Sequence, residues 1–139
     1  MFFVCLCTSS MVNSHPIILL FETDRFYREL VQKRLKKGGV DVSTLRSTEI
    51  NFNRITEIMP CLILIDLSTA LGHNHSIIVK LKEDQRTATI PIIAFVSDVL
   101  SFTKKRTLEN HGVHCLEKPL DFKKLQARIR QATKQVASY

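Results

Sequence analysis

Five short apolar segments are spaced along this chain of 139 residues, and a stretch with helical periodicity follows each of them. The apolar segments are predicted to be strands at residues 16–21, 40–45, 61–66, 91–97 and 113–117. The stretches after them are predicted to be helices at about 25–37, 50–58, 75–84, 99–110 and 121–136. Strands this apolar are typical of a parallel sheet covered by helices on both faces. Right-handed crossovers then predict a doubly wound α/β fold.

The first predicted helix shows the pattern on which these assignments rest. One helical face within residues 25–37 carries Tyr27, Leu30, Val31 and Leu35. A glycine pair follows as the expected end of the helix. The same 3.6-residue period places apolar side chains inward in the last predicted helix. Each helix is therefore expected to cover the sheet with one face.

Composition limits the class of protein. The hydrophobic content of 45% and the charged content of 24% are those of one globular domain with a real core. The four cysteines (Cys5, Cys7, Cys61 and Cys115) form no CxxC pair, which favours a reducing, cytoplasmic setting. The net charge of +7 comes from basic residues spread over several predicted helices, without a nucleic-acid motif. We therefore expect no direct contact with nucleic acid.

The beginning of the chain is treated separately. The apolar part of residues 1–13, Phe2 to Cys7, is too short for a signal-peptide core or a membrane span, so no membrane association is expected. Met11 is a sensible alternative start, just before the first strand. We expect residues 1–13 to be an extension outside the core and residues 14–139 to form a single domain.

Charged residues stand where three of the strands end. The first strand runs into Glu22-Thr23-Asp24, the third ends at Asp66, and the fifth ends at Glu117-Lys118-Pro119. Loops after the first, third and fifth strands converge at the carboxyl edge of a doubly wound sheet, where such sheets carry their sites. Carboxylates that accept a phosphoryl group and hold Mg²⁺, beside a neutralising ammonium, suit phosphoryl chemistry.

Other interpretations of these residues stay open. An acid at a strand end is often only solvated, and a Lys-Pro pair is often only a turn. Four histidines (His73, His75, His111 and His114) lack the spacing of a metal site, and histidines in loops are usually only polar. A catalytic pair of Cys115 and His114 is disfavoured, because neighbours in a strand point to opposite faces.

At these residues the chain resembles the receiver domain of two-component response regulators, over about residues 15–136. The segment "IILLFETDRFYRELVQKRL" resembles the opening strand and helix of that family, and "CLILIDLSTALG" resembles the segment with its phosphoaccepting aspartate. "IPIIAFVS" and "HGVHCLEKPLD" resemble its fourth and fifth strands. The resemblance implies a flavodoxin-like fold with strand order 2-1-3-4-5.

The resemblance also implies roles for individual residues. Asp66 takes the place of the phosphoacceptor and Lys118 that of the phosphate-sensing lysine. Glu22, Asp66 and the backbone carbonyl of Ser68 take the places of the Mg²⁺ ligands. A histidine kinase or phosphotransfer protein is the implied phosphodonor. A downstream protein is expected on the face formed by the fourth helix, fifth strand and fifth helix.

Three positions depart from the family's pattern. Thr23 stands where a second acid of the metal pair is expected, and Asp24 falls one residue too late. Val96 replaces the hydroxyl residue at the end of the fourth strand, and Cys115 replaces the switch aromatic. Removing one carboxylate predicts weak Mg²⁺ binding, because Mg²⁺ relies on few protein carboxylates. The pattern predicts an atypical receiver.

We therefore expect a stand-alone, atypical receiver that accepts a phosphoryl group on Asp66 and acts through a protein partner, not an enzyme. A phosphorylation-independent pseudo-receiver, which serves as an interaction module, is the alternative. A small nucleotide- or flavin-binding domain of the same architecture is a third, distant possibility. The sequence has no Gly-rich phosphate loop after its first strand, which argues against it.

Overall fold

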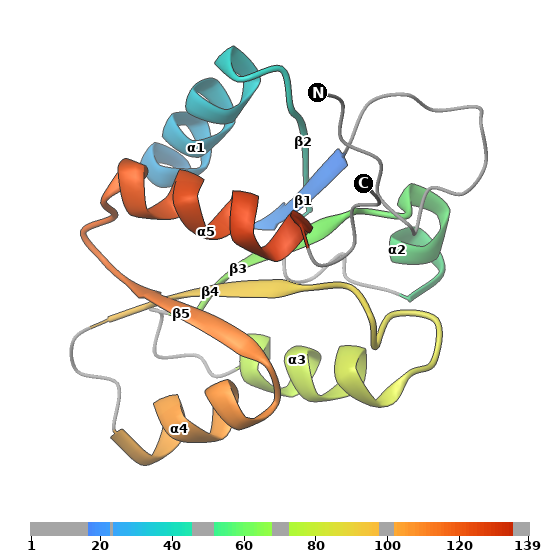
Figure 1. The fold of residues 1–139 in the computed structure, drawn as a ribbon. Helices are drawn as coiled ribbons and strands as arrows, with labels where there is room; N and C mark the ends of the chain where they lie inside the picture. Colours follow the sequence, from blue (N-terminus) through green and yellow to red (C-terminus); the bar gives the residue numbers. More distant parts are fainter. Residues whose placement is uncertain (1–16, 23, 46–51, 68–72, 98–101, 135–139) are drawn as a thin grey trace.

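The computed structural model describes residues 17–22, 24–45, 52–67, 73–97 and 102–134. Strands and helices alternate along the chain (Figure 1). The strands are β1 (Ile17–Phe21), β2 (Asp41–Thr44), β3 (Leu62–Asp66), β4 (Ile92–Val96) and β5 (Val113–Glu117). The helices are α1 (Arg25–Lys37), α2 (Phe52–Ile58), α3 (His73–Glu83), α4 (Phe102–Asn110) and α5 (Phe122–Lys134). Each predicted strand and helix is present.

The strands form one parallel sheet in the order β2-β1-β3-β4-β5, which confirms the predicted fold class. β3 lies at the centre, and all five of its residues are buried. Phe21 pairs with Ile65, and Asp66 pairs with Phe95. Because the strands are parallel, their carboxyl ends meet at one edge of the sheet.

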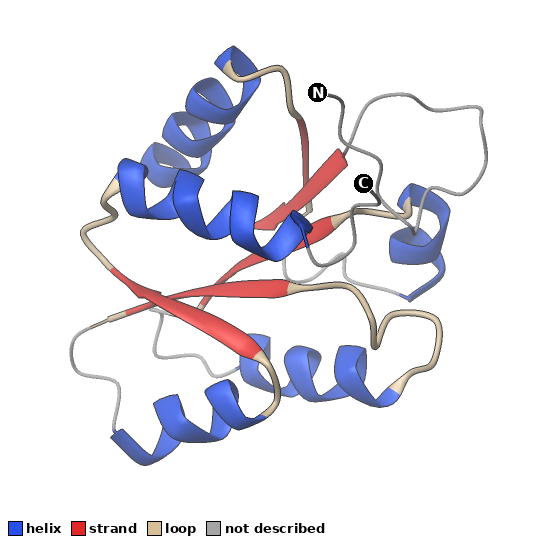
Figure 2. Ribbon diagram, in the orientation of Figure 1, coloured by secondary structure: helices blue, strands red, loops and turns tan. Residues whose placement is uncertain are grey.

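Helices cover both faces of the sheet (Figure 2). On one face, Val31 and Leu35 of α1 and Leu125 of α5 pack in a core with Leu62 and Leu64 of β3. On the other face, residues of α2, α3 and α4 pack with the alternate side chains of β3, among them Ile63 and Ile65. The period of two along β3 therefore divides the core into two layers.

Local signals set both ends of α1. The Asp24 carboxylate accepts hydrogen bonds from the backbone N–H groups of Phe26 and Tyr27, at 2.8 and 3.3 Å, and so caps the helix. At the other end the Gly39 N–H donates to the Lys36 carbonyl at 3.0 Å. Gly39 has a φ of 81°, which favours glycine because it has no Cβ. The predicted bounds of α1, 25–37, match the structure for this reason.

One predicted helix start was wrong. α3 begins at His73, two residues before the predicted start. His114 lies in β5, as the predicted strand at 113–117 places it, and His111 lies in the turn between α4 and β5. The first turn of α3 carries no apolar residue before Ile77, and periodicity alone therefore places its start too late.

Several predictions fall on residues outside the described ranges: the extension 1–13, the start at Met11, Cys5 and Cys7. The other two cysteines, Cys61 and Cys115, are thiols and form no disulfide. None of the helices in the described ranges is long and apolar enough to cross a membrane.

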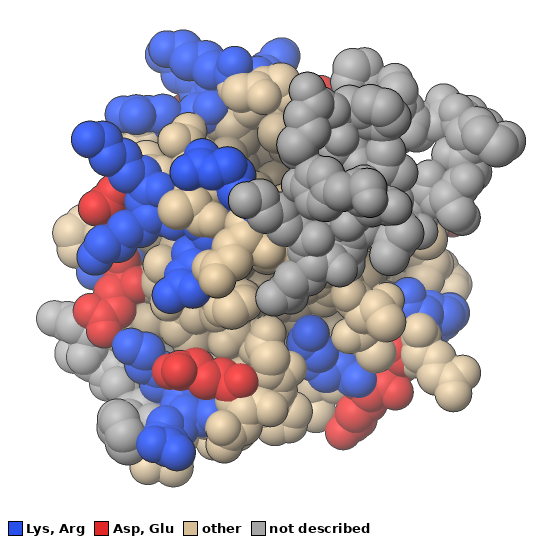
Figure 3. Space-filling view, in the orientation of Figure 1, with Lys and Arg blue, Asp and Glu red and all other residues tan. Residues whose placement is uncertain are grey.

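Basic side chains lie over the helices, as the sequence predicted. Figure 3 shows Lys and Arg side chains gathered over α1 and α5, with few acids between them. The guanidinium of Arg34 on α1 lies 4.9 Å from the ring centroid of Phe122 on α5, so the two helices meet through a cation–π contact. The absence of nucleic-acid binding stays a prediction.

A buried hydroxyl fixes the end of α3. The Thr87 side chain is fully buried, and its Oγ1 donates to the Leu81 carbonyl at 2.6 Å. Leu81 lies in the last turn of α3, where carbonyls have no partner inside the helix. The hydrogen bond thus satisfies an acceptor that water cannot reach.

Thr87→Val should lower the free energy of unfolding by about 1–3 kcal/mol, because the Leu81 carbonyl then stays buried without its donor. Urea unfolding followed by circular dichroism measures this change. Thr107→Val is the matched control, since the Thr107 hydroxyl donates to the Thr103 carbonyl at 2.9 Å on the exposed surface. Its effect should stay within about 0.5 kcal/mol. Equal effects of the two substitutions would contradict a structural role for Thr87.

Candidate functional site

The carboxyl ends of β1, β3 and β5 bring the predicted site residues to one edge of the sheet. Glu22 and Asp66 end up side by side, because Phe21 pairs with Ile65. At the end of β5, the Lys118 N–H donates to the Val96 carbonyl at 2.8 Å, so Lys118 is carried to the same edge by β4. The peptide bond from Lys118 to Pro119 is cis.

Lys118 bridges the two carboxylates. Its Nζ lies 2.9 Å from Oε1 of Glu22 and 3.3 Å from Oδ1 of Asp66. The Glu22 and Asp66 side chains are 0% and 1% exposed, and the Lys118 side chain is 13% exposed. Buried ion pairs interact strongly because water screens them little. Glu22, Asp66 and Lys118 thus form one buried charged cluster, although they are far apart in the sequence.

Tyr27 covers the ammonium from α1. The Lys118 Nζ lies 4.2 Å from the centroid of the Tyr27 ring, which is a cation–π contact. Tyr27 lies in the first turn of α1, where Asp24 accepts its backbone N–H. Sequence reasoning placed Tyr27 on the inward face of the helix but did not connect it with Lys118. The sequence feature that could have indicated this contact is the position of Tyr27, three residues after Asp24, the acid that caps α1.

Burial dominates the electrostatics of Glu22. Loss of water raises the pKa of its carboxyl most, the hydrogen bond from Lys118 lowers it and the charge of Asp66 raises it, so that the pKa of Glu22 lies at about 7. The Asp24 N–H also donates to Oε1, at 3.2 Å. In the described part of the chain, Oε2 of Glu22 is a buried acceptor without a hydrogen-bond partner. Such an oxygen is available to a cation.

The ammonium of Lys118 stays charged. Burial lowers the pKa of Lys118, but the hydrogen bond and charge of Glu22 and the charge of Asp66 outweigh burial. The pKa of Lys118 is therefore raised above its usual value. A permanently charged group stands beside Asp66 at physiological pH.

The carboxylates have the chemistry of a Mg²⁺ site. Hard oxygen ligands suit Mg²⁺, and the unpartnered Oε2 of Glu22 lies in the same buried cluster as Asp66. Thr23 and Ser68, the other positions predicted to matter for the metal, lie outside the described residues. No group of three or more His, Cys, Asp or Glu side chains gathers within the described ranges.

Val96 and Cys115, which were predicted to be altered switch positions, lie on the same side of the sheet. Val96 is 1% exposed and belongs to the core layer under α2, α3 and α4. Cys115 is half-buried and packs against that layer. Burial raises the pKa of the Cys115 thiol, so it stays protonated. Neither side chain offers a strong hydrogen-bond donor to a phosphoryl group at Asp66.

The pKa of Glu22 predicts a pH dependence of stability. Below pH 4.5 the carboxyl is protonated in the folded and the unfolded chain. Between pH 4.5 and about 7 only the folded chain keeps the proton, so stability falls as pH rises. Glu22→Gln removes this fall. The free energy of unfolding of the variant minus that of the wild type should therefore grow by on the order of 3 kcal/mol across this window.

Urea unfolding in metal-free buffer at several pH values measures this difference. Glu29→Gln, at an exposed position on α1, controls for the loss of one negative charge. A difference between Glu22→Gln and the wild type that does not change with pH would contradict the burial of this carboxyl.

The comparisons with known proteins agree with the fold. No family model matches the chain. The DNA-binding dual master transcriptional regulator RpaA of Synechocystis is 26% identical over 115 residues, which are 83% of this chain and 48% of that protein. The chain thus spans about half the length of this curated relative.

Solved structures match nearly the whole chain. A response regulator receiver protein from Pseudomonas putida superposes with a TM-score of 0.72 at 22% identity, over 86% of this chain and 99% of that one. The chemotaxis protein CheY4 of Vibrio cholerae superposes with a TM-score of 0.72 at 17% identity, over 85% of this chain and 98% of that one. The chain therefore has the fold of a response-regulator receiver domain, as the resemblance in its sequence indicated.

Proposed function

We propose that this chain is an atypical receiver in two-component or phosphorelay signalling, and that Asp66 accepts a phosphoryl group. One observation supports this role above others. The Lys118 Nζ lies 3.3 Å from the Asp66 carboxylate and 2.9 Å from Glu22, at the carboxyl edge of the sheet. A nucleophilic carboxylate with an adjacent fixed cation is what an in-line phosphoryl transfer needs.

In the proposed reaction, a carboxylate oxygen of Asp66 attacks the phosphorus of a phosphohistidine on a histidine kinase or phosphotransfer protein. The O–P bond forms as the P–N bond breaks, and the electron pair of the broken bond goes to the imidazole nitrogen. Lys118 neutralises charge on the phosphoryl oxygens. Because Glu22 already holds Lys118, the incoming phosphoryl group competes with Glu22 for the ammonium. The acceptor is the chain itself, so the proposed role is not that of an enzyme.

Glu22 and Asp66 would hold Mg²⁺, with the Ser68 carbonyl as a further ligand. When bound, Mg²⁺ neutralises phosphoryl oxygens during transfer. Support comes from the unpartnered, buried Oε2 of Glu22. We propose weak binding, because Thr23 stands where a second acid is expected and Lys118 already offsets part of the negative charge.

A pseudo-receiver that works without phosphorylation is the second candidate, and Val96 favours it. Loss of a hydrogen bond to a charged group removes about 1.5–3 kcal/mol. A typical allosteric coupling is about 1–3 kcal/mol, so the missing hydroxyl is comparable to the whole coupling. The small Cys115 side chain also cannot act as an aromatic gate. We infer that phosphorylation, where it occurs, changes the α4–β5–α5 face little.

The proposed partners are a phosphodonor protein and a downstream protein on the α4–β5–α5 face. A cytoplasmic location is proposed as well, and the thiols of Cys61 and Cys115, which form no disulfide, support a reducing environment.

Incubation with acetyl phosphate and Mg²⁺ should add the mass of one phosphoryl group to the wild type. Intact-protein mass spectrometry at neutral pH measures this gain. Asp66→Asn should abolish it, whereas Asp41→Asn, at an exposed position on β2, should keep it. A wild type that gains no mass, or an Asp66→Asn variant that still gains it, would overturn the phosphoacceptor role.

The residues at positions 96 and 115 predict which parts of the chain change when a phosphoryl mimic binds. With beryllofluoride and Mg²⁺ as a phosphoryl mimic, amide chemical shifts of the wild type should change only near Glu22, Asp66 and Lys118, because Val96 gives the mimic no hydroxyl to attract. The double variant Val96→Thr with Cys115→Tyr should extend the changes across residues 102–130. Large changes across these residues in the wild type would contradict this prediction and indicate an ordinary phosphorylation switch.

A further inference from the structure

The outer edge of β5 is open in the described part of the chain. Within the described ranges, β5 is the last strand of the sheet and pairs only with β4. The Lys118 N–H points to β4, so alternation along the strand directs the backbone groups of Cys115 and Glu117 away from β4. Unpaired backbone groups at a sheet edge are a template for another strand.

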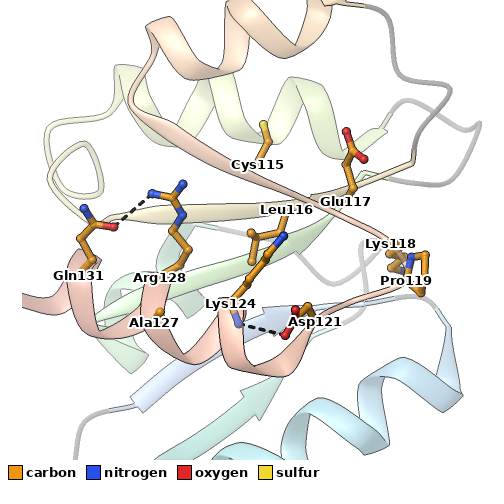
Figure 4. A pocket seen from close by; sticks show the side chains of 10 residues that line it. All are labelled: Cys115, Leu116, Glu117, Lys118, Pro119, Asp121, Lys124, Ala127, Arg128 and Gln131. Carbon is orange, nitrogen blue, oxygen red and sulfur yellow. Dashed lines mark hydrogen bonds between the residues drawn. The ribbon is translucent and has the colours of Figure 1, made fainter.

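A groove follows this edge along the length of β5. A cavity of about 650 Å³ lies between β5 and α5, where Leu116, Lys118, Lys124 and Arg128 line it (Figure 4). A second cavity, of about 500 Å³, lies at the beginning of β5 beside α4. Both cavities are lined by Cys115 and Arg128, so they are neighbours. Five strand residues span about 16 Å, which is room for a short added strand.

The groove has uncompensated positive charge. Lys124 and Arg128 are one helical turn apart on α5, and Figure 4 shows both side chains directed from α5 toward β5. Arg128 donates to the neutral Gln131 side chain at 3.1 Å. Among the described residues neither cation has a carboxylate within ion-pair distance.

The acids that line the larger cavity already have partners. Glu117 lies 3.6 Å from Lys105. Asp121 caps α5, because it accepts the backbone N–H groups of Lys123 and Lys124. Glu109 lines only the smaller cavity. Negative side chains from a partner would therefore meet the free charges of Lys124 and Arg128.

We propose that the β5 edge groove docks an extended, acidic segment of a partner protein as an added strand. Backbone hydrogen bonds to β5 supply the pairing, and carboxylates on alternate residues of the segment reach Lys124 and Arg128. A helix in the groove would leave the backbone groups of β5 unpaired. The inference rests on the proposed function, since it names the kind of segment by which the downstream partner binds.

The probe is the peptide acetyl-Thr-Glu-Val-Glu-Val-Thr-amide, titrated into the full unphosphorylated chain and followed by amide chemical shifts. Residues 113–117 and 124–131 should shift. Lys124→Glu with Arg128→Glu should weaken binding about tenfold or more, because attraction becomes repulsion. Lys33→Glu with Lys37→Glu is the matched control, with the same charge change and spacing on the exposed face of α1. It should leave the affinity within about twofold.

Two further peptides test the mode of binding. A version with alternate amides methylated cannot pair along β5 and should not bind. A version with Lys in place of Glu should bind at least about tenfold more weakly. Equal binding of either version, no shift in β5 with the acidic peptide, or tighter binding of an acidic helical peptide at the same residues would overturn the proposal. The titration needs no phosphodonor, so its failure is distinct from failure of Asp66 to gain a phosphoryl group.

Discussion

The Lys118 ammonium allows two carboxylates to lie buried side by side at the edge of the sheet. Burial of an unpaired carboxylate is costly, and two of them in contact also repel each other. Nζ of Lys118 offsets both, at 2.9 Å from Glu22 and 3.3 Å from Asp66. This contact requires β1, β3 and β5 to end at one edge, with β4 carrying β5 into place. The charged cluster can therefore form only with this strand order.

β1, β3 and β4 could be predicted because each is a nearly continuous apolar run, as burial on both faces demands. β2 and β5, at the edges of the sheet, mix polar and apolar residues and are less buried. The bounds of α1 could be predicted because a capping acid and a glycine pair mark its ends. Strand order does not follow from periodicity, and it came from the resemblance to the receiver family. The start of α3 was missed because His73 and Asn74 carry no apolar signal.

The site could be predicted to the level of residues but not of contacts. Charged residues after apolar strands point to Glu22, Asp66 and Lys118, since parallel strands share one edge. Which oxygen meets the ammonium depends on the length of the glutamate side chain and on burial, which no pattern encodes. Tyr27 has the spacing of an ordinary core residue, so its contact with Lys118 could not be predicted from the sequence. The groove along β5 depends on the direction of side chains from α5.

The contact between Tyr27 and Lys118 makes Tyr27 an intrinsic spectroscopic probe of the site. The chain has no tryptophan and two tyrosines. A positive charge 4.2 Å from the ring centroid perturbs the ring through its quadrupole. If Lys118 moves toward a new anion, the near-ultraviolet absorption of Tyr27 changes without any added dye. Replacing Tyr139 by phenylalanine leaves Tyr27 as the only tyrosine, so that the state of the ammonium can be followed in real time.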